Sequence, residues 1–164
     1  MVINLMRSDP KSMIPQIRSI KQHKFYKGQP IQPLVDYLNS IEPLPLVTLD
    51  EHACQACRNN TDRKMKTDED TGKDHFEKGG NQEEFQGMIG NGKGIETTEC
   101  TQIGWNGSAQ DLIFFLLVDG FKDQKSHAIL DPKLIKVGIS FKAHKKLHNV
   151  FQILYVKQIS NNMN

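Results

Sequence analysis

The sequence has few cysteines and no long hydrophobic run, and each absence restricts what the chain can be. Its 164 residues include three cysteines, so at most one disulfide can form and a disulfide framework is excluded. The longest apolar run, Leu112–Val118, has seven residues, whereas a membrane-spanning helix needs about 20. The N-terminal stretch carries Arg7 and Asp9 within any apolar segment, so no signal peptide is visible and the location stays unknown.

An excess of one charge sign is also absent. The chain has 21 basic and 19 acidic residues, whereas a dedicated nucleic-acid-binding domain shows a strong basic excess. We therefore expect no nucleic-acid partner and no transmembrane segment. A chain of this length can bury a substantial core without disulfides. Its length predicts one domain over residues 1–164.

The hydrophobic pattern predicts both helices and strands. Apolar residues recur every three or four positions in the segments expected to be helical: Asp9–Ile20, Leu34–Ile41, Asp50–Lys66 and Ser108–Val118. Alternation and β-branched residues favour strands in three others, which we expect in one antiparallel sheet: Thr97–Ile103, Ile135–Phe141 and Val150–Val156. Five residues are expected in one core: Phe115, Leu116, Val137, Ile139 and Ile153. The polar stretch Lys66–Gly94 predicts a long loop with a short helical piece around Glu83–Ile89.

Two short patterns carry little weight on their own. Cys54 and Cys57 form a C-x-x-C pair on an expected helix, with only Cys100 and scattered histidines to complete a zinc site. Two small buried or half-buried residues explain this pair better than a metal or redox role. The N-glycosylation patterns at Asn59 and Asn106 matter only if the chain is secreted.

The order of several segments resembles a known family. The chain carries LLVDG at Leu116–Gly120, then His127-x-ILDPK, then VGI at Val137–Ile139. The opening Asn4-x-x-Arg7-x-Asp9-Pro10 also matches the start of that family. These segments resemble the CAP superfamily of cysteine-rich secretory and pathogenesis-related proteins, in the form of its microbial and protozoan SCP-like domains. The resemblance extends from Asn4 to Val156.

The resemblance implies a fold and a site. The fold would be α+β, an α-β-α sandwich with a small antiparallel sheet between helical layers. Members share a cleft of two histidines and two acids, which in some members holds a divalent metal such as zinc. Carried over to this chain, the metal-binding residues would be His75, Glu99, Asp119 and His127. Glu96 competes with Glu99, because a register slip of one residue exchanges the faces of a strand.

Three functions follow from these observations. The first is a non-enzymatic SCP-like binding domain whose ligand is a lipid, a metal or a protein. The second is a metal-dependent hydrolase or protease that uses the same four residues, although no HExxH sequence is present. The third is a degenerate structural member whose cleft has lost its function. The resemblance also implies secretion. Of the three, we expect binding without catalysis.

Overall fold

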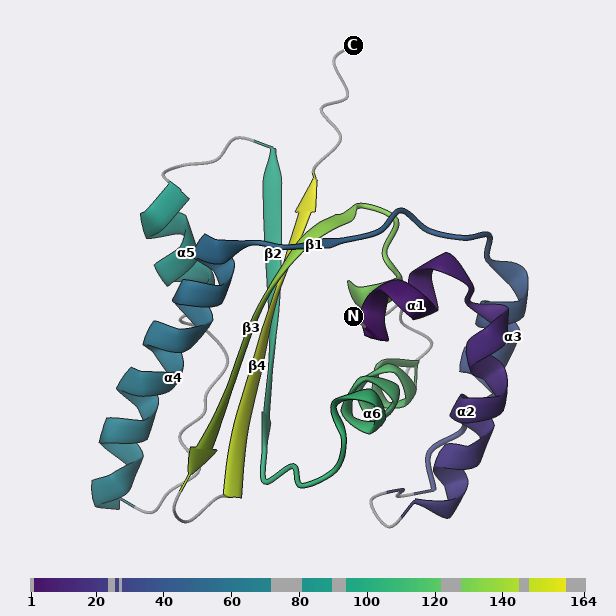
Figure 1. Ribbon diagram of the computed structural model, residues 1–164, viewed down its shortest axis with the longest axis horizontal. Helices are drawn as coiled ribbons and strands as arrows, with labels where there is room; N and C mark the ends of the chain where they lie inside the picture. The colour runs from purple at the N-terminus through teal and green to yellow at the C-terminus, as the bar shows by residue number, and fades with distance from the viewer. Residues whose placement is uncertain are drawn as a thin grey trace. The chain divides into compact units, whose positions relative to one another are not determined.

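The chain forms two compact units. The computed structural model describes residues 2–23, 26, 28–71, 81–89, 94–121, 128–144 and 148–158. Unit 1 comprises residues 1–47 and 107–132, and unit 2 comprises residues 48–106 and 133–164. The expected single domain over residues 1–164 stays a prediction. The mixture of helices with one small sheet confirms the α+β class (Figure 1).

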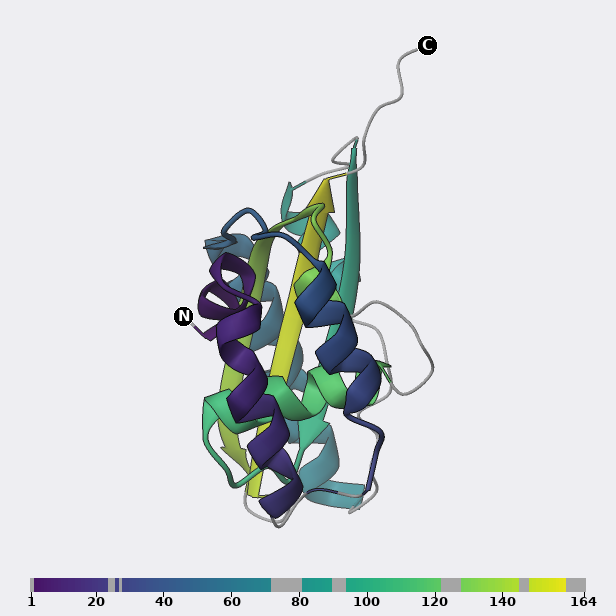
Figure 2. The ribbon, with the colours of Figure 1, turned by 90° about the vertical axis from the view of Figure 1, so that its right-hand side faces the viewer.

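Unit 1 is helical in its described part. Its elements are α1 (Val2–Ser8), η1 (Lys11–Met13), α2 (Ile14–Ser19), η2 (Ile20–Gln22), α3 (Gln32–Ser40), α6 (Ala109–Phe121) and η3 (Ala128–Leu130). Figure 2 shows α6 crossing α2 and α3, and α6 also packs against α1. The prediction of one helix over Asp9–Ile20 is wrong in its start. A separate helix α1 precedes it, and short 3₁₀ turns and α2 replace the continuous helix. Pro15 fits the first turn of α2, where its missing N–H costs nothing.

Helix α6 is the apolar element of unit 1. Its buried residues are Leu112, Ile113, Phe114, Leu117, Val118 and Phe121. Phe115 and Leu116 are only half-buried, so their placement in the common core was wrong. Because α6 is apolar on nearly every side, its sequence does not show which residues face the core. Ser108 begins this helix with a capping box, since its hydroxyl and the Asp111 carboxylate each accept from the backbone N–H of the other residue.

Arg7 connects three segments of unit 1 and is fully buried. Its guanidinium donates to the carbonyl oxygens of Pro45 and Ile129, both at 2.6 Å, and of Asp131 at 2.9 Å. Burial lowers the pKa of this guanidinium, and the charge of Asp131 opposes that effect. Arginine remains charged in proteins, so α1 inserts a cation among backbone carbonyls.

Unit 2 contains the sheet. Its strands are β1 (Thr48–Leu49), β2 (Ile95–Ile103), β3 (Leu134–His144) and β4 (His148–Gln158). The order is β1-β3-β4-β2, and the three long strands pair antiparallel, as predicted. The short β1 pairs parallel to β3, so the sheet is mixed and the purely antiparallel prediction is corrected. Two residues are too few to produce an alternating pattern, which explains why β1 was missed.

Three residues of the sheet were expected in the core. Val137 and Ile153 are fully buried, as predicted, whereas Ile139 is only half-buried. The backbone N–H of Ile139 donates to the Cys54 Sγ at 3.4 Å, so β3 makes a polar contact with the neighbouring helix at this position.

Helices α4 (Glu51–Thr71) and α5 (Asn81–Ile89) lie along one face of this sheet (Figure 1). Asp50 caps α4, because its Oδ1 accepts from the N–H of Ala53 at 3.0 Å. The helix approaches β3 so closely that a Cβ at Gly138 would lie 2.3 Å from the carbonyl carbon of Ala53. An apolar cluster fills the interface: Ala53, Ala56, Cys57, Phe85, Leu154 and Val156. Cys57 is therefore a small core residue, as the sequence favoured.

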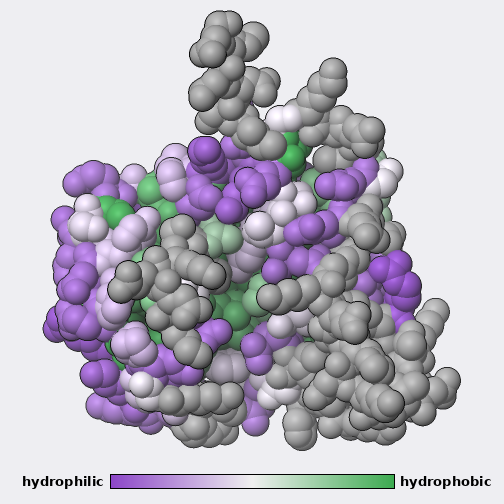
Figure 3. Space-filling model, turned by 180° about the vertical axis from the view of Figure 1, so that it is seen from behind, coloured by the Kyte–Doolittle hydropathy of each residue, from purple (hydrophilic) through white to green (hydrophobic). Residues whose placement is uncertain are grey.

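Hydrophilic residues dominate the face drawn in Figure 3, where hydrophobic residues show only in limited areas. Among the helices that the structure describes, none combines the length and the apolar character needed to cross a membrane. Exposed large hydrophobic side chains are Leu5, Leu46, Leu49 and Phe141.

Candidate functional site: a pocket beside His23

The four residues expected to bind a metal are only partly described. His75 and His127 lie outside the described residues. Glu99 lies on β2 in unit 2, and Asp119 is exposed near the end of α6 in unit 1. Within the described ranges, no group of three or more histidine, cysteine, aspartate or glutamate side chains is arranged to hold a metal ion. The metal cleft thus stays a prediction of the resemblance.

Glu99 has a contact that sequence reasoning did not anticipate. Its Oε2 accepts from the backbone N–H of Gln82 at 3.3 Å, in the first turn of α5. The Gln82 amide also donates to the carbonyl oxygen of Thr97 at 2.9 Å. A carboxylate at a helix N-terminus accepts otherwise unpaired N–H groups and is favoured by the helix dipole. Glu99 therefore joins α5 to β2, whereas the competing Glu96 is exposed.

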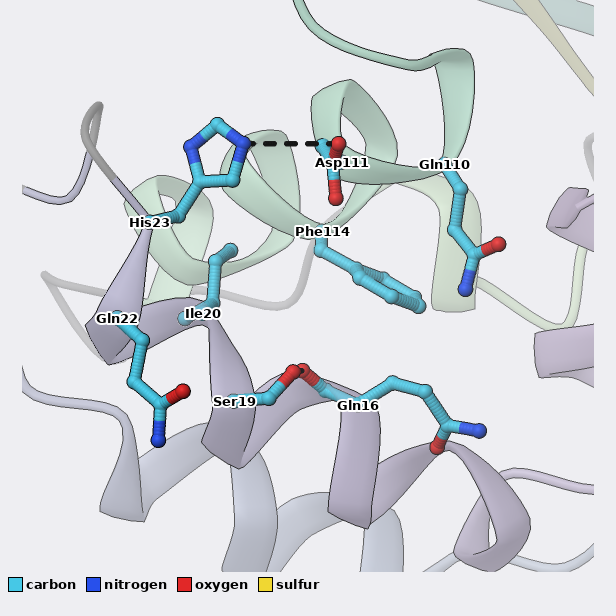
Figure 4. A pocket seen from close by; sticks show the side chains of 8 residues that line it. All are labelled: Gln16, Ser19, Ile20, Gln22, His23, Gln110, Asp111 and Phe114. Atoms are coloured by element: carbon cyan, nitrogen blue, oxygen red, sulfur yellow. Dashed lines mark hydrogen bonds and ion pairs between the residues drawn. The ribbon is translucent and has the colours of Figure 1, made fainter.

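A different group of polar side chains surrounds a pocket in unit 1. This pocket has a volume of about 280 Å³ and lies between the α2–η2 segment and the start of α6. Figure 4 shows its lining: Gln16, Ser19, Ile20, Gln22, His23, Gln110, Asp111 and Phe114. We call it the His23 pocket. Ile20 and Phe114 are almost fully buried and supply an apolar wall, while the other six side chains are polar.

His23 and Asp111 form the ionisable pair of the pocket. The imidazole Nε2 lies 3.6 Å from the Asp111 Oδ2, and both side chains are partly exposed. The imidazole also packs edge-on against Phe115, with 5.4 Å between ring centroids. The Ser108 hydroxyl donates to the same Asp111 oxygen at 2.7 Å. The capping box thus holds the carboxylate, and the carboxylate together with Phe115 holds the ring.

The described lining residues do not form a nucleophile–base set. Ser19 is the hydroxyl residue in the lining, and it donates to the carbonyl oxygen of Gln16 at 2.7 Å. Figure 4 shows this hydroxyl well away from the imidazole of His23. An activated serine needs hydrogen-bond contact with its base. The described lining therefore does not place the Ser19 hydroxyl where His23 could activate it.

Sequence reasoning missed the His23 pocket. The sequence around His23 is polar and is followed by Gly28, Pro30 and Pro33, a pattern that predicts a linker and gives no sign of a pocket. The Ser108-x-x-Asp111 spacing is a readable capping signature, and it places an acid at the start of a buried helix. No sequence signal, however, connects that acid to a histidine far away in the chain.

Comparisons with known proteins give one structural likeness. No family model matches the chain, and no curated protein matches its sequence. The fold is similar to that of an outer surface protein from Borrelia burgdorferi, with a TM-score of 0.50 and 12% sequence identity. The alignment covers 93% of this chain and 95% of that one. This likeness extends over nearly the whole α+β fold and concerns the fold alone.

Proposed function

We propose that the protein is a non-enzymatic binding domain that holds a small ligand in the His23 pocket. The observation that carries this proposal is the pocket itself, which is lined by six polar side chains beside an apolar wall formed by Ile20 and Phe114. Concave sites that combine apolar walls with a few oriented polar groups are the usual form of small-molecule sites.

Two polar groups of the pocket are held in place before any ligand arrives. The Asp111 carboxylate is fixed by Ser108, and the Ser19 hydroxyl is fixed by the carbonyl of Gln16. A preorganised site loses less conformational entropy when it binds. This rigidity supports recognition, while the separation of Ser19 from His23 gives no support to hydrolysis.

The CAP resemblance, the structural likeness and the polar lining of the pocket are compatible with this function. The resemblance to the CAP superfamily implies a binding domain in which catalysis is not required. The structurally similar Borrelia protein is named as an outer surface protein, and its likeness to this chain supports the α+β fold in which the pocket lies. The polar lining disfavours a long acyl chain, since glutamine side chains would face methylene groups without hydrogen bonds.

A ligand screen by amide NMR tests the proposal. Compounds from a small-fragment library should shift signals of residues 16–23 and 110–114 together. Gln110→Trp should block the pocket and abolish these shifts. Ala109→Trp is the matched control, because Ala109 is exposed on the same turn but does not line the pocket. Binding that survives Gln110→Trp, no binding by any fragment, or conversion of a bound compound would contradict the proposal.

A further inference from the structure

We infer that the ligand of the His23 pocket is an uncharged polyhydroxylated ring, such as one pyranose unit of a saccharide. This inference rests on the proposed function, since it names the chemistry of the ligand for that same pocket. Its support comes from the charge, the hydrogen-bonding character, the apolar wall and the size of the pocket.

The charge of the lining favours a neutral ligand. Among the described residues around the pocket, the ionisable side chains are His23 and Asp111, and they face each other at 3.6 Å. No described lysine or arginine lines the pocket to bind a phosphate or a carboxylate. The carboxylate of Asp111 already has the imidazole and the Ser108 hydroxyl as partners, so it is a poor site for an ammonium group. Among the described lining residues, no side chain offers an unpaired charge of either sign to an anion or a cation.

The hydrogen-bonding groups match hydroxyls. Amide side chains present both donors and acceptors, as sugar hydroxyls do. With the oxygen and nitrogen of its amide exchanged, Gln16 donates to the carbonyls of Ser12 at 2.9 Å and Met13 at 3.3 Å, and in that orientation its oxygen is left to accept. The Ser19 oxygen, whose proton is used by Gln16, can likewise accept. Gln22 and Gln110 add further amides, so a ring with several hydroxyls can pair at more than one point.

The apolar wall and the volume favour one ring. Ile20 and Phe114 are 4% and 3% exposed, so they close the floor of the pocket and leave a small apolar area that the C–H groups of one pyranose can cover. A volume of about 280 Å³ lies just below the range of about 300–1,000 Å³ typical of drug-sized ligands. A single sugar unit fits this size, whereas a folded acyl chain or an extended oligosaccharide would project into solvent.

The test compares ligand classes on the whole chain by NMR titration. The neutral probes are methyl glucoside, methyl galactoside, methyl mannoside and N-acetylglucosamine. The comparison probes are glucuronate as an anion, glucosamine as a cation, decanoate as a lipid and a capped triglycine as a peptide. At least one neutral sugar should shift signals of residues 16–23 and 110–114 more strongly than every comparison probe.

Variants then connect binding to the lining. Gln110→Ala should weaken the binding of that sugar by about 2–10-fold, the equivalent of one lost hydrogen bond. Gln32→Ala, an exposed glutamine on α3, should leave the affinity unchanged. Thermal unfolding of both variants checks that the fold is retained.

The outcomes separate this inference from the proposed function. If a charged, lipid or peptide probe binds in the pocket and no neutral sugar does, the saccharide inference is overturned and the binding function stands. If sugar binding is insensitive to Gln110→Ala, the saccharide inference is also overturned. If no probe and no fragment of the wider screen binds at these residues, both ideas are removed.

Discussion

Asn4 and Val47 exchange two hydrogen bonds across unit 1. The Asn4 side-chain Nδ2 donates to the carbonyl oxygen of Val47 at 2.9 Å, and the Val47 backbone N–H donates to the Asn4 Oδ1 at 3.0 Å. One turn later, Arg7 donates to the carbonyl of Pro45 on the same segment. The Asn-x-x-Arg spacing at the start of the chain therefore holds an extended segment against α1. Side chains at i and i+3 share one face of a helix, so a single helix turn can make both contacts.

The first prediction concerns Arg7. Arg7→Met keeps much of the side-chain volume but leaves three carbonyl groups without their donor. We expect a loss of about 3–5 kcal/mol in the free energy of unfolding, because each buried carbonyl group left without its donor costs about 1–3 kcal/mol. Urea denaturation measures this loss. Arg18→Met is the control, since Arg18 is exposed on α2, and it should cost less than about 0.5 kcal/mol. Equal effects of the two changes would show that Arg7 is not a structural anchor.

The second prediction concerns the contact between α4 and β3. Gly138→Ala places a methyl group 2.3 Å from the carbonyl carbon and 2.4 Å from the carbonyl oxygen of Ala53, so the helix must move away. Overpacking of this kind costs about 1–3 kcal/mol, and backbone atoms cannot rotate aside as a side chain can. Gly87→Ala on α5 is the matched control. It meets no atom within 4 Å and should stabilise by about 0.5–1 kcal/mol. A neutral Gly138→Ala would mean that α4 can shift without cost.

The third prediction concerns the acid dependence of unit 2. Burial disfavours the charged form of Asp50, but hydrogen bonds from Lys136 and Ala53 and the charges of Lys136 and His52 outweigh it, so the pKa of Asp50 is lowered. A lowered pKa in the folded state stabilises the fold above the unfolded value of about 3.9, and this stabilisation is lost as pH falls through the folded pKa.

Asp50→Asn tests this dependence, because asparagine keeps the capping oxygen and removes the charge. The variant should be less stable than the wild type near neutral pH, and the difference should begin to shrink as the pH falls below about 4 and vanish below the folded pKa of Asp50. Denaturation at a series of pH values gives the comparison. Asp62→Asn is the control, because Asp62 forms an exposed pair with Lys142, and such pairs contribute little. A difference for Asp50→Asn that stays constant with pH would reject the argument.

The fourth prediction concerns the thiols. Burial raises the pKa of Cys57 to about 12, and the neighbouring Cys54 and Glu99 contribute to that rise, so the reactive thiolate is scarce at neutral pH. Cys54 and Cys100 are only partly buried. A maleimide should modify Cys54 and Cys100 well before Cys57, as peptide mass spectrometry can follow. In urea all three should react alike. Rapid labelling of Cys57 in the folded protein would reopen a redox role for the C-x-x-C pair.

The elements with strong local patterns were predictable from the sequence. The long strands β2, β3 and β4, the start of α4 at Asp50 and helix α6 follow from alternation, capping and apolar runs. The buried face of α6 was not predictable, because Phe115 and Leu116 are as apolar as their buried neighbours Phe114 and Leu117. Burial in such a helix depends on which side meets other elements, and that is tertiary information.

The His23 pocket was not predictable for a similar reason. It requires that the end of η2 meets the first turn of α6, and nothing in either segment specifies the other. The Glu99 contact with α5 likewise depends on strand register and on a helix that follows a long polar stretch. The sequence could name Glu99 as an acid on the correct strand, but its partner Gln82 became visible only in the fold.

The last prediction concerns the metal cleft of the CAP resemblance, in which His75, Glu99, Asp119 and His127 hold a divalent ion. Zinc should then bind to the wild type, and His127→Ala should weaken binding near neutral pH. Binding should also weaken on acidification, because protonated histidines cannot be ligands. His23→Ala is the matched control, since His23 belongs to a different pocket.

Glu99→Gln is the informative variant, because Glu99 already accepts a hydrogen bond from Gln82. If Glu99 only stabilises α5, Glu99→Gln lowers the free energy of unfolding and leaves zinc binding unchanged. If it is a ligand, zinc affinity falls as well. Isothermal calorimetry with the wild type and the three variants decides between these outcomes. If the wild type binds no zinc, the metal cleft is rejected, and the proposal for the His23 pocket is not affected.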